Sequence, residues 1–168
     1  QSIFYESNNL KHVIFPENLK EIGNTAFYGC DSLETVTFPE GLERIGDGAF
    51  AYCPNLTEVT IPNSVTYWGS ESASGLGNAF EYSGLKTVHL NEGRTEIPSY
   101  AFIHCENLTD INIPSTVEKI GDYAFDYCNS LESIVLPEGL TSLGMAAFAN
   151  TGSLRSIVLP KSLTKYGW

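Results

Sequence analysis

The 168-residue sequence has no hydrophobic run approaching the roughly 20 residues that cross a membrane as a helix. It is also poor in charge: only 17% of its residues are charged, with nine Lys and Arg against 20 Asp and Glu. The resulting net charge of −11 repels phosphate backbones and anionic lipids. We therefore expect no membrane insertion and no nucleic-acid partner.

The chain begins with Gln1 rather than with methionine, and no signal peptide is recognisable near its start. Its hydrophobic content of 42% is too high for a disordered chain and is sufficient for one packed core. We therefore expect residues 1–168 to form a single domain that is a fragment of a longer protein.

The dominant feature of the sequence is an internal repeat with a period of about 23 residues. One leucine marks each unit, and the steps between successive markers are equal except for one longer step, from Leu56 to Leu85. The markers are Leu10, Leu33, Leu56, Leu85, Leu108, Leu131 and Leu154. A single unit of this size has too little apolar surface to fold alone, so we expect about seven units to stack on one another.

Each unit opens with alternating apolar and polar residues, as in LETVTFP (33–39), which predicts a strand with one buried face. Pro39 lacks a backbone donor and ends that strand. A second apolar pair, such as Leu42 and Ile45, leads to a glycine and a compact turn. Phenylalanine recurs at this turn, and stacked units would form a continuous aromatic spine of Phe4, Phe27, Phe50, Phe80, Phe102, Phe125 and Phe148.

Glycine holds one position in most units, namely Gly23, Gly46, Gly69, Gly121, Gly144 and Gly167. The fourth full unit has Pro98 there instead. Because the proline ring fixes φ at a negative value, a left-handed backbone is not the general requirement at this position. Close approach of neighbouring backbones is the better explanation.

The succession of LxxVxF/IP, LxxIG and xxAFxxC over essentially the whole chain resembles the BspA-like leucine-rich repeats of bacterial and protozoan surface antigens. The resemblance implies an α/β repeat solenoid: a right-handed leucine-rich-repeat superhelix with a curved parallel β-sheet on the concave side and short strands and turns on the convex side. It also implies a cell-surface or secreted, extracellular protein with a role in adhesion or host contact.

Four cysteines, Cys30, Cys53, Cys105 and Cys128, occupy one repeat position. Equivalent side chains in neighbouring units point the same way about 4.8 Å apart, whereas a disulfide needs Cβ atoms about 3.8 Å apart. A ladder of small buried thiols is therefore expected. Zinc needs converging ligands rather than one cysteine per unit, so we expect no metal.

The third and fifth positions of each strand are expected to point away from the core, onto the concave face. On the central strands these residues are polar and able to form hydrogen bonds. The predicted binding residues are Thr35, Thr37, Glu58, Thr60, Thr87, His89, Asp110 and Asn112. Towards the C-terminal end, Val135 and Val158 would form an apolar strip on the same face.

His89 is expected to lie in one row with Thr60 and Asn112, with Glu58 and Asp110 on the diagonals. It is either a solvated histidine or one whose protonation beside these carboxylates makes binding sensitive to pH. Catalysis needs a nucleophile, an oriented base and oxyanion donors in a closed pocket. No serine is placed next to His89, so we expect no enzyme, no catalytic residue and no cofactor.

A second stripe lies two positions after each phenylalanine and contains Tyr52, Tyr82, His104 and Tyr127. These rings either cover the cysteine row and stiffen the neighbouring turns, or form a contact surface, where aromatic rings also stack on sugars. The stretch YWGSESASGLGNAF (67–80) carries a seven-residue insertion, expected to be a surface loop. Residues 70–76 are then either a product of drift or part of a partner site. Asn91 replaces the usual proline nearby, and Arg94 replaces the usual Leu or Val.

Two functions remain open from the sequence. The first is a binding or adhesion module that recognises a protein or glycan, such as a host extracellular molecule, through its concave sheet. The alternative is a structural spacer that displays other domains and has no ligand of its own. Because neither end of the chain shows a polar capping unit, end-to-end self-association is a further expectation.

Overall fold

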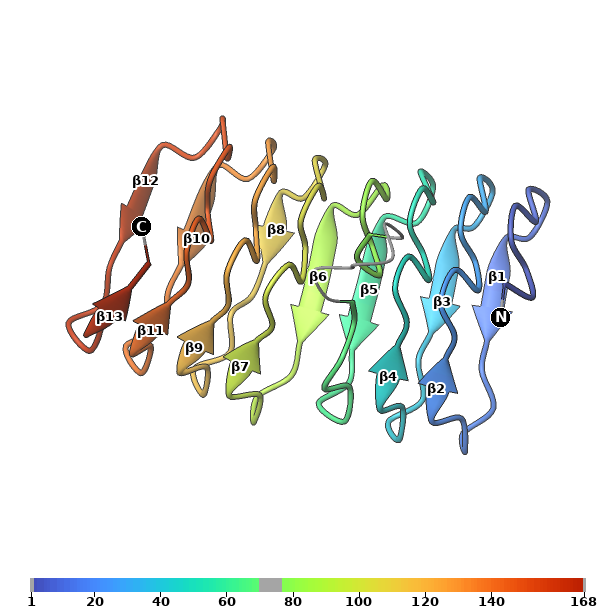
Figure 1. Ribbon diagram of the computed structural model, residues 1–168, viewed down its shortest axis with the longest axis horizontal. Helices are drawn as coiled ribbons and strands as arrows, with labels where there is room; N and C mark the ends of the chain where they lie inside the picture. Colours follow the sequence, from blue (N-terminus) through green and yellow to red (C-terminus); the bar gives the residue numbers. More distant parts are fainter. Residues whose placement is uncertain (1, 70–76, 168) are drawn as a thin grey trace.

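The structure is a computed structural model, and it describes residues 2–69 and 77–167. Over these ranges the chain coils into a solenoid whose successive units lie side by side (Figure 1). The predicted strands form a first row: β1 (His12–Ile14), β3 (Thr35–Thr37), β5 (Glu58–Ile61), β6 (Thr87–Leu90), β8 (Asp110–Ile111), β10 (Ser133–Val135) and β12 (Ser156–Val158). The stacking of repeat units is thereby confirmed.

A second row of two-residue strands contains the second residue of the apolar pair in most units, as Ile45 does in β4. It contains β2 (Glu21–Ile22), β4 (Arg44–Ile45), β7 (Glu96–Ile97), β9 (Lys119–Ile120), β11 (Ser142–Leu143) and β13 (Lys165–Tyr166). All strand pairs in both rows are parallel. The first row divides into three ladders, β1-β3, β5-β6-β8 and β10-β12, rather than forming the single sheet expected from the sequence.

Within residues 2–69 and 77–167 no helix is present, so the expected α/β description is not confirmed. The physical reason lies in the turn around each phenylalanine. Two residues per unit have positive φ there, as at Thr25 (51°) and Gly29 (66°), and repeated left-handed residues are incompatible with a right-handed helix. The Phe27 amide instead donates across to the Ala49 carbonyl of the next unit, at 2.8 Å. The handedness and curvature of the coil stay predictions.

The interior is one continuous core built from the repeat positions predicted to be apolar. Leu33, Leu56, Leu85, Leu108 and Leu131 are fully buried, while Leu10 and Leu154 at the two ends are only partly buried. Such packed side chains supply most of the favourable free energy of folding, because burying each one contributes roughly 1.5–3 kcal/mol.

The aromatic spine is present but has one break. Rings stack at centroid distances of 5.1–5.7 Å from Phe4 through Phe27 and Phe50 to Phe80, and again from Phe102 through Phe125 to Phe148. No ring contact joins Phe80 to Phe102 in the described part of the chain. The unit between them is one residue shorter than the others, and the Trp68 ring contacts Phe102 at 6.1 Å. The expectation of an uninterrupted spine was therefore wrong at this unit.

The glycine position is a place of close backbone approach, as the sequence predicted. A Cβ atom added to Gly46 would lie 2.5 Å from the Asn24 backbone nitrogen and 2.7 Å from the Gly23 carbonyl carbon. Gly46 itself has no positive φ, so space and not left-handed geometry requires glycine there. Pro98 lines a cavity together with Thr66 of the preceding unit, so its ring has room where Gly46 has none.

The four cysteines are buried free thiols, as expected. Each Sγ donates a weak hydrogen bond to the phenylalanine carbonyl of the preceding unit, for example Cys53 to Phe27 at 3.1 Å and Cys128 to Phe102 at 3.3 Å. Each cysteine therefore supplies a hydrogen-bond donor to a phenylalanine carbonyl in the turn of the preceding unit. Burial raises the pKa of Cys53 and of Cys105 to about 12, so these thiols stay protonated at neutral pH.

Replacing Gly46 with alanine should lower the free energy of unfolding by about 1–3 kcal/mol, because the new methyl group has to push two backbones apart. Gly152→Ala is the matched control, since a Cβ there would meet nothing within 4 Å. Urea denaturation of the two variants checks this expectation. Equal stability of both variants would show that close approach is not what requires glycine.

Iodoacetamide at pH 8 should label none of Cys53, Cys105 and Cys128 rapidly in the folded protein, because their thiolates are suppressed by burial. In denaturant all four cysteines should be labelled quickly, and intact mass counts the adducts. Rapid labelling of the native protein would contradict this expectation.

The buried thiols also make stability depend on pH. The free energy of unfolding should fall as pH rises from 9 towards 12, because only the unfolded thiols then lose protons.

Candidate functional site

The candidate site is the strand face, defined as the outward side chains of the first-row strands. Parallel pairing sets Glu58 opposite Thr87 and Thr87 opposite Asp110, so these three residues form one row across β5, β6 and β8. Thr60 pairs with His89 in the next row. The structure thus brings five of the predicted binding residues together on one three-stranded sheet.

Most of the predicted site residues are solvent-exposed, and Thr87 is half-buried. His89 Nε2 lies 2.8 Å from Glu58 Oε1, which joins the two rows across the β5–β6 pair. Asn112 is used differently from what the sequence indicated. Its amide accepts from the Leu90 N–H at 3.0 Å and donates to the Leu90 carbonyl at 2.8 Å, so it extends the pairing of β6 with the chain after β8.

Two grooves border the central sheet where the first row loses its ladder. One lies between β3 and β5, has a volume of about 420 Å³ and is lined by Thr35, Thr37, Glu58 and Thr60. The other lies between β8 and β10, measures about 490 Å³ and is lined by Asp110, Asn112 and Val135. The predicted residues therefore line both grooves as well as the sheet between them.

The predicted apolar strip lies towards the C-terminal end of the strand face. Val135 pairs with Val158 there, and these side chains are 83% and 79% exposed, which confirms the apolar strip.

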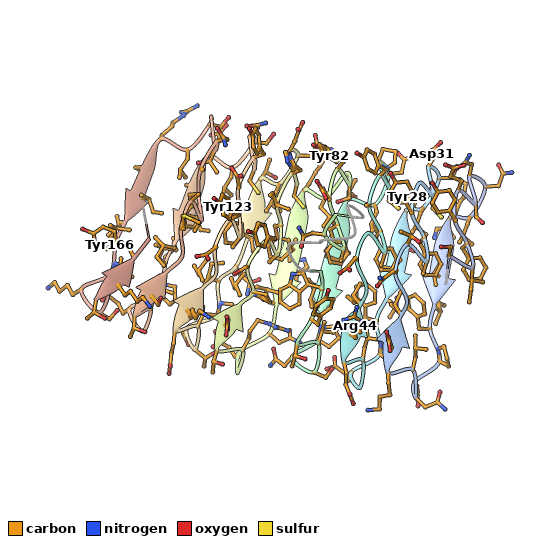
Figure 2. All side chains as sticks on the ribbon, viewed as in Figure 1. Tyr28, Asp31, Arg44, Tyr82, Tyr123 and Tyr166 are labelled. Atoms are coloured by element: carbon orange, nitrogen blue, oxygen red, sulfur yellow. The ribbon has the colours of Figure 1, made fainter. Side chains whose placement is uncertain are left out.

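The tyrosine stripe forms a second surface along one edge of the coil, where Figure 2 labels its member Tyr82. Its rings contact one another in series: Tyr52 and Tyr82 at 5.0 Å, Tyr82 and His104 at 4.6 Å, and His104 and Tyr127 at 4.5 Å between centroids. Stacked rings cover each other's faces and leave only their edges to solvent. The inner rings are therefore not free to stack on a sugar, and the stiffening role is the better interpretation.

These aromatic residues also have an unfavourable backbone conformation. Tyr52, Tyr82, His104 and Tyr127 have φ between 54° and 59°, in the left-handed region that costs a non-glycine residue roughly 1–2 kcal/mol. Glycine occupies the same position in another unit, as Gly29 with φ of 66°. The ring contacts offset this cost, because each aromatic pair contributes about 0.5–1.5 kcal/mol.

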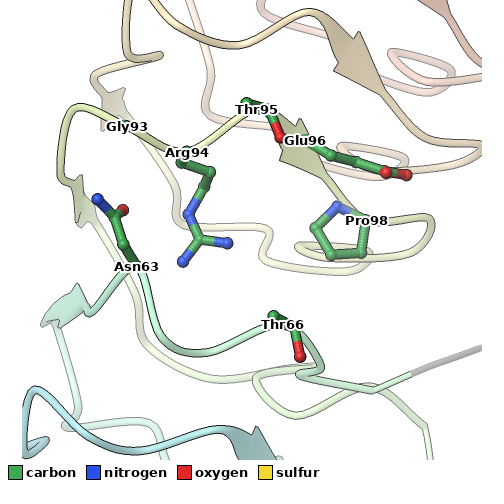
Figure 3. Close-up of a pocket in the computed structure, with 7 residues that line it drawn as sticks. All are labelled: Asn63, Thr66, Gly93, Arg94, Thr95, Glu96 and Pro98. Atoms are coloured by element: carbon green, nitrogen blue, oxygen red, sulfur yellow. The ribbon is translucent and has the colours of Figure 1, made fainter.

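A third feature is a cavity that the sequence did not predict. It has a volume of about 350 Å³ and lies between the Asn63–Thr66 segment and the Gly93–Pro98 segment (Figure 3). Arg94 lines it although only 7% of this residue is exposed. Its guanidinium carbon lies 4.6 Å from the centroid of the Trp68 ring. Trp68 occupies the position that Ile45 and Ile120 hold in other units. This departure from the repeat, together with Arg94, is the sequence signal that could have indicated the contact between Trp68 and Arg94.

The seven inserted residues, 70–76, lie outside the described residues, so both interpretations of that segment stay predictions. In the part of the chain that is described, no helix is long and apolar enough to cross a membrane. Likewise, no group of three or more His, Cys, Asp or Glu side chains there is arranged to hold a metal ion.

Comparison with known proteins identifies the repeat. The family model of the BspA type leucine rich repeat region matches six copies over residues 1–76 and 76–167, so the chain belongs to that family. No curated protein matches the chain. The family and the similar structures are leucine-rich-repeat proteins, and no enzyme family is indicated.

Three solved structures illustrate the similarity. A leucine-rich repeat protein from Bacteroides ovatus is 32% identical with a TM-score of 0.71, over 95% of this chain and 45% of that one. One from Eubacterium ventriosum is 30% identical with a TM-score of 0.76, over 94% and 41%. The pneumococcal vaccine antigen PcpA is 26% identical with a TM-score of 0.53, over 95% and 47%. The chain thus spans less than half the length of each.

Replacing Tyr82 separates the cost of its backbone from the gain of its ring contacts. Tyr82→Ala loses the stacking on Tyr52 and His104 but keeps the left-handed strain, so we expect a loss of about 1–3 kcal/mol in unfolding free energy. Tyr82→Gly also loses the stacking but relieves the strain, so it should be more stable than the alanine variant by about 1 kcal/mol. Thermal denaturation compares the two, and equal melting temperatures would show that no strain is stored at this position.

Proposed function

We propose that this protein is a non-catalytic binding or adhesion module, displayed at the cell surface or secreted, whose strand face recognises a protein or glycan. The observation that carries the proposal is the alignment of Glu58, Thr87 and Asp110 in one outward-facing row between two grooves, with both carboxylates exposed. The fold needs only strand-compatible residues at these outward positions, so it does not require carboxylates, hydroxyls and an imidazole there. The concentration of these groups on the strand face therefore supports recognition of a polar partner.

The extracellular part of the proposal rests on family membership and on similarity. The chain belongs to the BspA-type leucine-rich repeats, and one similar structure is that of a vaccine antigen. The net charge of −11 supports a surface that a basic or hydroxylated partner fits better than an acidic one. The open grooves suit an extended partner better than an enclosed small molecule.

A spacer function is the second candidate, and one observation favours it. Exposed ion pairs join neighbouring units along the coil, as between Lys11 and Glu34 at 3.0 Å and between Lys119 and Glu96 at 2.7 Å. Together with the stacked aromatic stripe, these contacts stiffen the solenoid without forming a ligand site. Such a rod would display other domains at a fixed distance.

The triple variant Glu58→Gln, His89→Asn and Asp110→Asn tests the strand face. It should reduce binding to the partner at least tenfold, because it removes the charges of the central rows, and it should leave the melting temperature within about 2 °C. Binding is measured on arrays of immobilised extracellular matrix proteins and glycans.

The matched control for the triple variant is Glu17→Gln with Glu138→Gln. Both residues lie in turns and line neither of the two grooves, and their replacement removes the same number of carboxylates. The control should bind as the wild-type protein does. Equal loss in both variants would indicate a net-charge effect, and a wild-type protein that binds nothing on the arrays would favour the spacer.

A further inference from the structure

The fourth unit places a cation where other units place an aliphatic core residue. Leu42, Val65, Val117 and Leu140 hold this position elsewhere and are fully buried. Arg94 holds it here and is buried as well, with an exposed fraction of only 7%. A buried charge is expensive unless an opposite charge and hydrogen bonds compensate it.

The compensation that Arg94 finds within the described residues is incomplete. Its Nη1 donates to the Val65 carbonyl at 3.0 Å and its Nη2 to the Pro62 carbonyl at 2.7 Å. A guanidinium has five N–H donors, and Nε has no partner in the described structure. No carboxylate of residues 2–69 or 77–167 forms an ion pair with it. Burial accordingly lowers the pKa of Arg94.

The surroundings of Arg94 form a receptacle and not a closed core. The guanidinium is held against the Trp68 ring and lines the cavity between the Asn63–Thr66 and Gly93–Pro98 segments (Figure 3). The remaining lining consists largely of hydroxyl, amide and backbone groups, including Asn63, Thr66 and Thr95. The one carboxylate among the lining residues, that of Glu96, already pairs with Lys119 at 2.7 Å.

We propose that this cavity binds the carboxylate of a small hydroxylated acid, such as a sugar acid, through Arg94. The planar fork of a guanidinium matches a carboxylate in shape. The ligand carboxylate in turn supplies the counter-charge that Arg94 lacks. The hydroxyl and amide groups of Thr66, Thr95 and Asn63 are placed to bind ligand hydroxyls. A volume of about 350 Å³ equals that of roughly twelve water molecules, at about 30 Å³ for each, which suits a single monosaccharide acid.

A carboxylate fits this site better than a phosphate does. The protein carries a net charge of −11, and Glu96 stands at the cavity wall, so a doubly charged anion is repelled more strongly than a singly charged one. The site is separate from the strand face, because none of its lining residues belongs to the first-row strands. Its failure would therefore leave the proposed binding role of that face untouched.

The test titrates the wild-type protein with sodium glucuronate and follows the arginine Nε–H signals by nuclear magnetic resonance. The sequence has only three arginines, Arg44, Arg94 and Arg155, so the Arg94 signal is assigned as the one absent from Arg94→Leu. We expect this signal to shift and saturate at millimolar ligand while the other two stay fixed. An unchanged Arg94 signal at about 20 mM glucuronate, well above the millimolar range of one bidentate contact, would overturn the proposal.

Variants and probes then separate the chemical contributions by calorimetry. Arg94→Leu restores the residue of other units, so it should melt no lower than wild type and bind glucuronate at least tenfold more weakly. Arg94→Lys keeps the charge without the fork and should fall between the two. Glucose, which lacks the carboxylate, should not bind, and acetate should bind more weakly than glucuronate. Equal binding of glucose, acetate or inorganic phosphate would overturn the assignment, as would undiminished binding by Arg94→Leu.

Discussion

Hydrogen bonds between equivalent backbone positions of neighbouring units are the interaction on which this structure depends. The Phe27 amide donates to the Ala49 carbonyl of the following unit, and the Gly46 amide donates to the Ile22 carbonyl of the preceding one, both at 2.8 Å. Because these bonds recur along the chain, each unit satisfies its polar backbone only when another unit lies beside it. Repetition of the sequence at a nearly constant interval is thus a direct requirement of the backbone.

The spacing between units explains why several residue types recur. At the strand rows and turns, equivalent atoms are about one strand spacing apart, which leaves no room for a side chain at Gly46 and stacks Phe27 on Phe50 at 5.1 Å. The same spacing brings the Cys53 thiol to the Phe27 carbonyl. It also aligns the outward residues of the strand face, so the constraint that builds the core positions the candidate binding rows as well.

Much of this arrangement could be predicted from the sequence because the repeat reports each constraint several times. The strand positions, the buried leucines, the free thiols and the close approach at Gly46 all follow from residues that recur in register. The absence of a helix could not be predicted in this way, because it depends on positive φ at residues such as Tyr123 and Tyr127, which are not typical left-handed residues. Nor could the ladder breaks be predicted: they reflect pairing geometry, and the grooves at the candidate site open where pairing lapses.

The departures from the repeat are as informative as the repeat itself. Random drift scatters substitutions, and most single replacements of a core leucine by arginine are destabilising. Here, two departures are physically coupled across a unit boundary, because the Trp68 ring in one unit supports the Arg94 guanidinium of the next. Natural sequences keep such local conflicts mainly where a site needs them. A solenoid can accept this conflict because its stability is spread over many interfaces, so one weakened interface leaves the others intact.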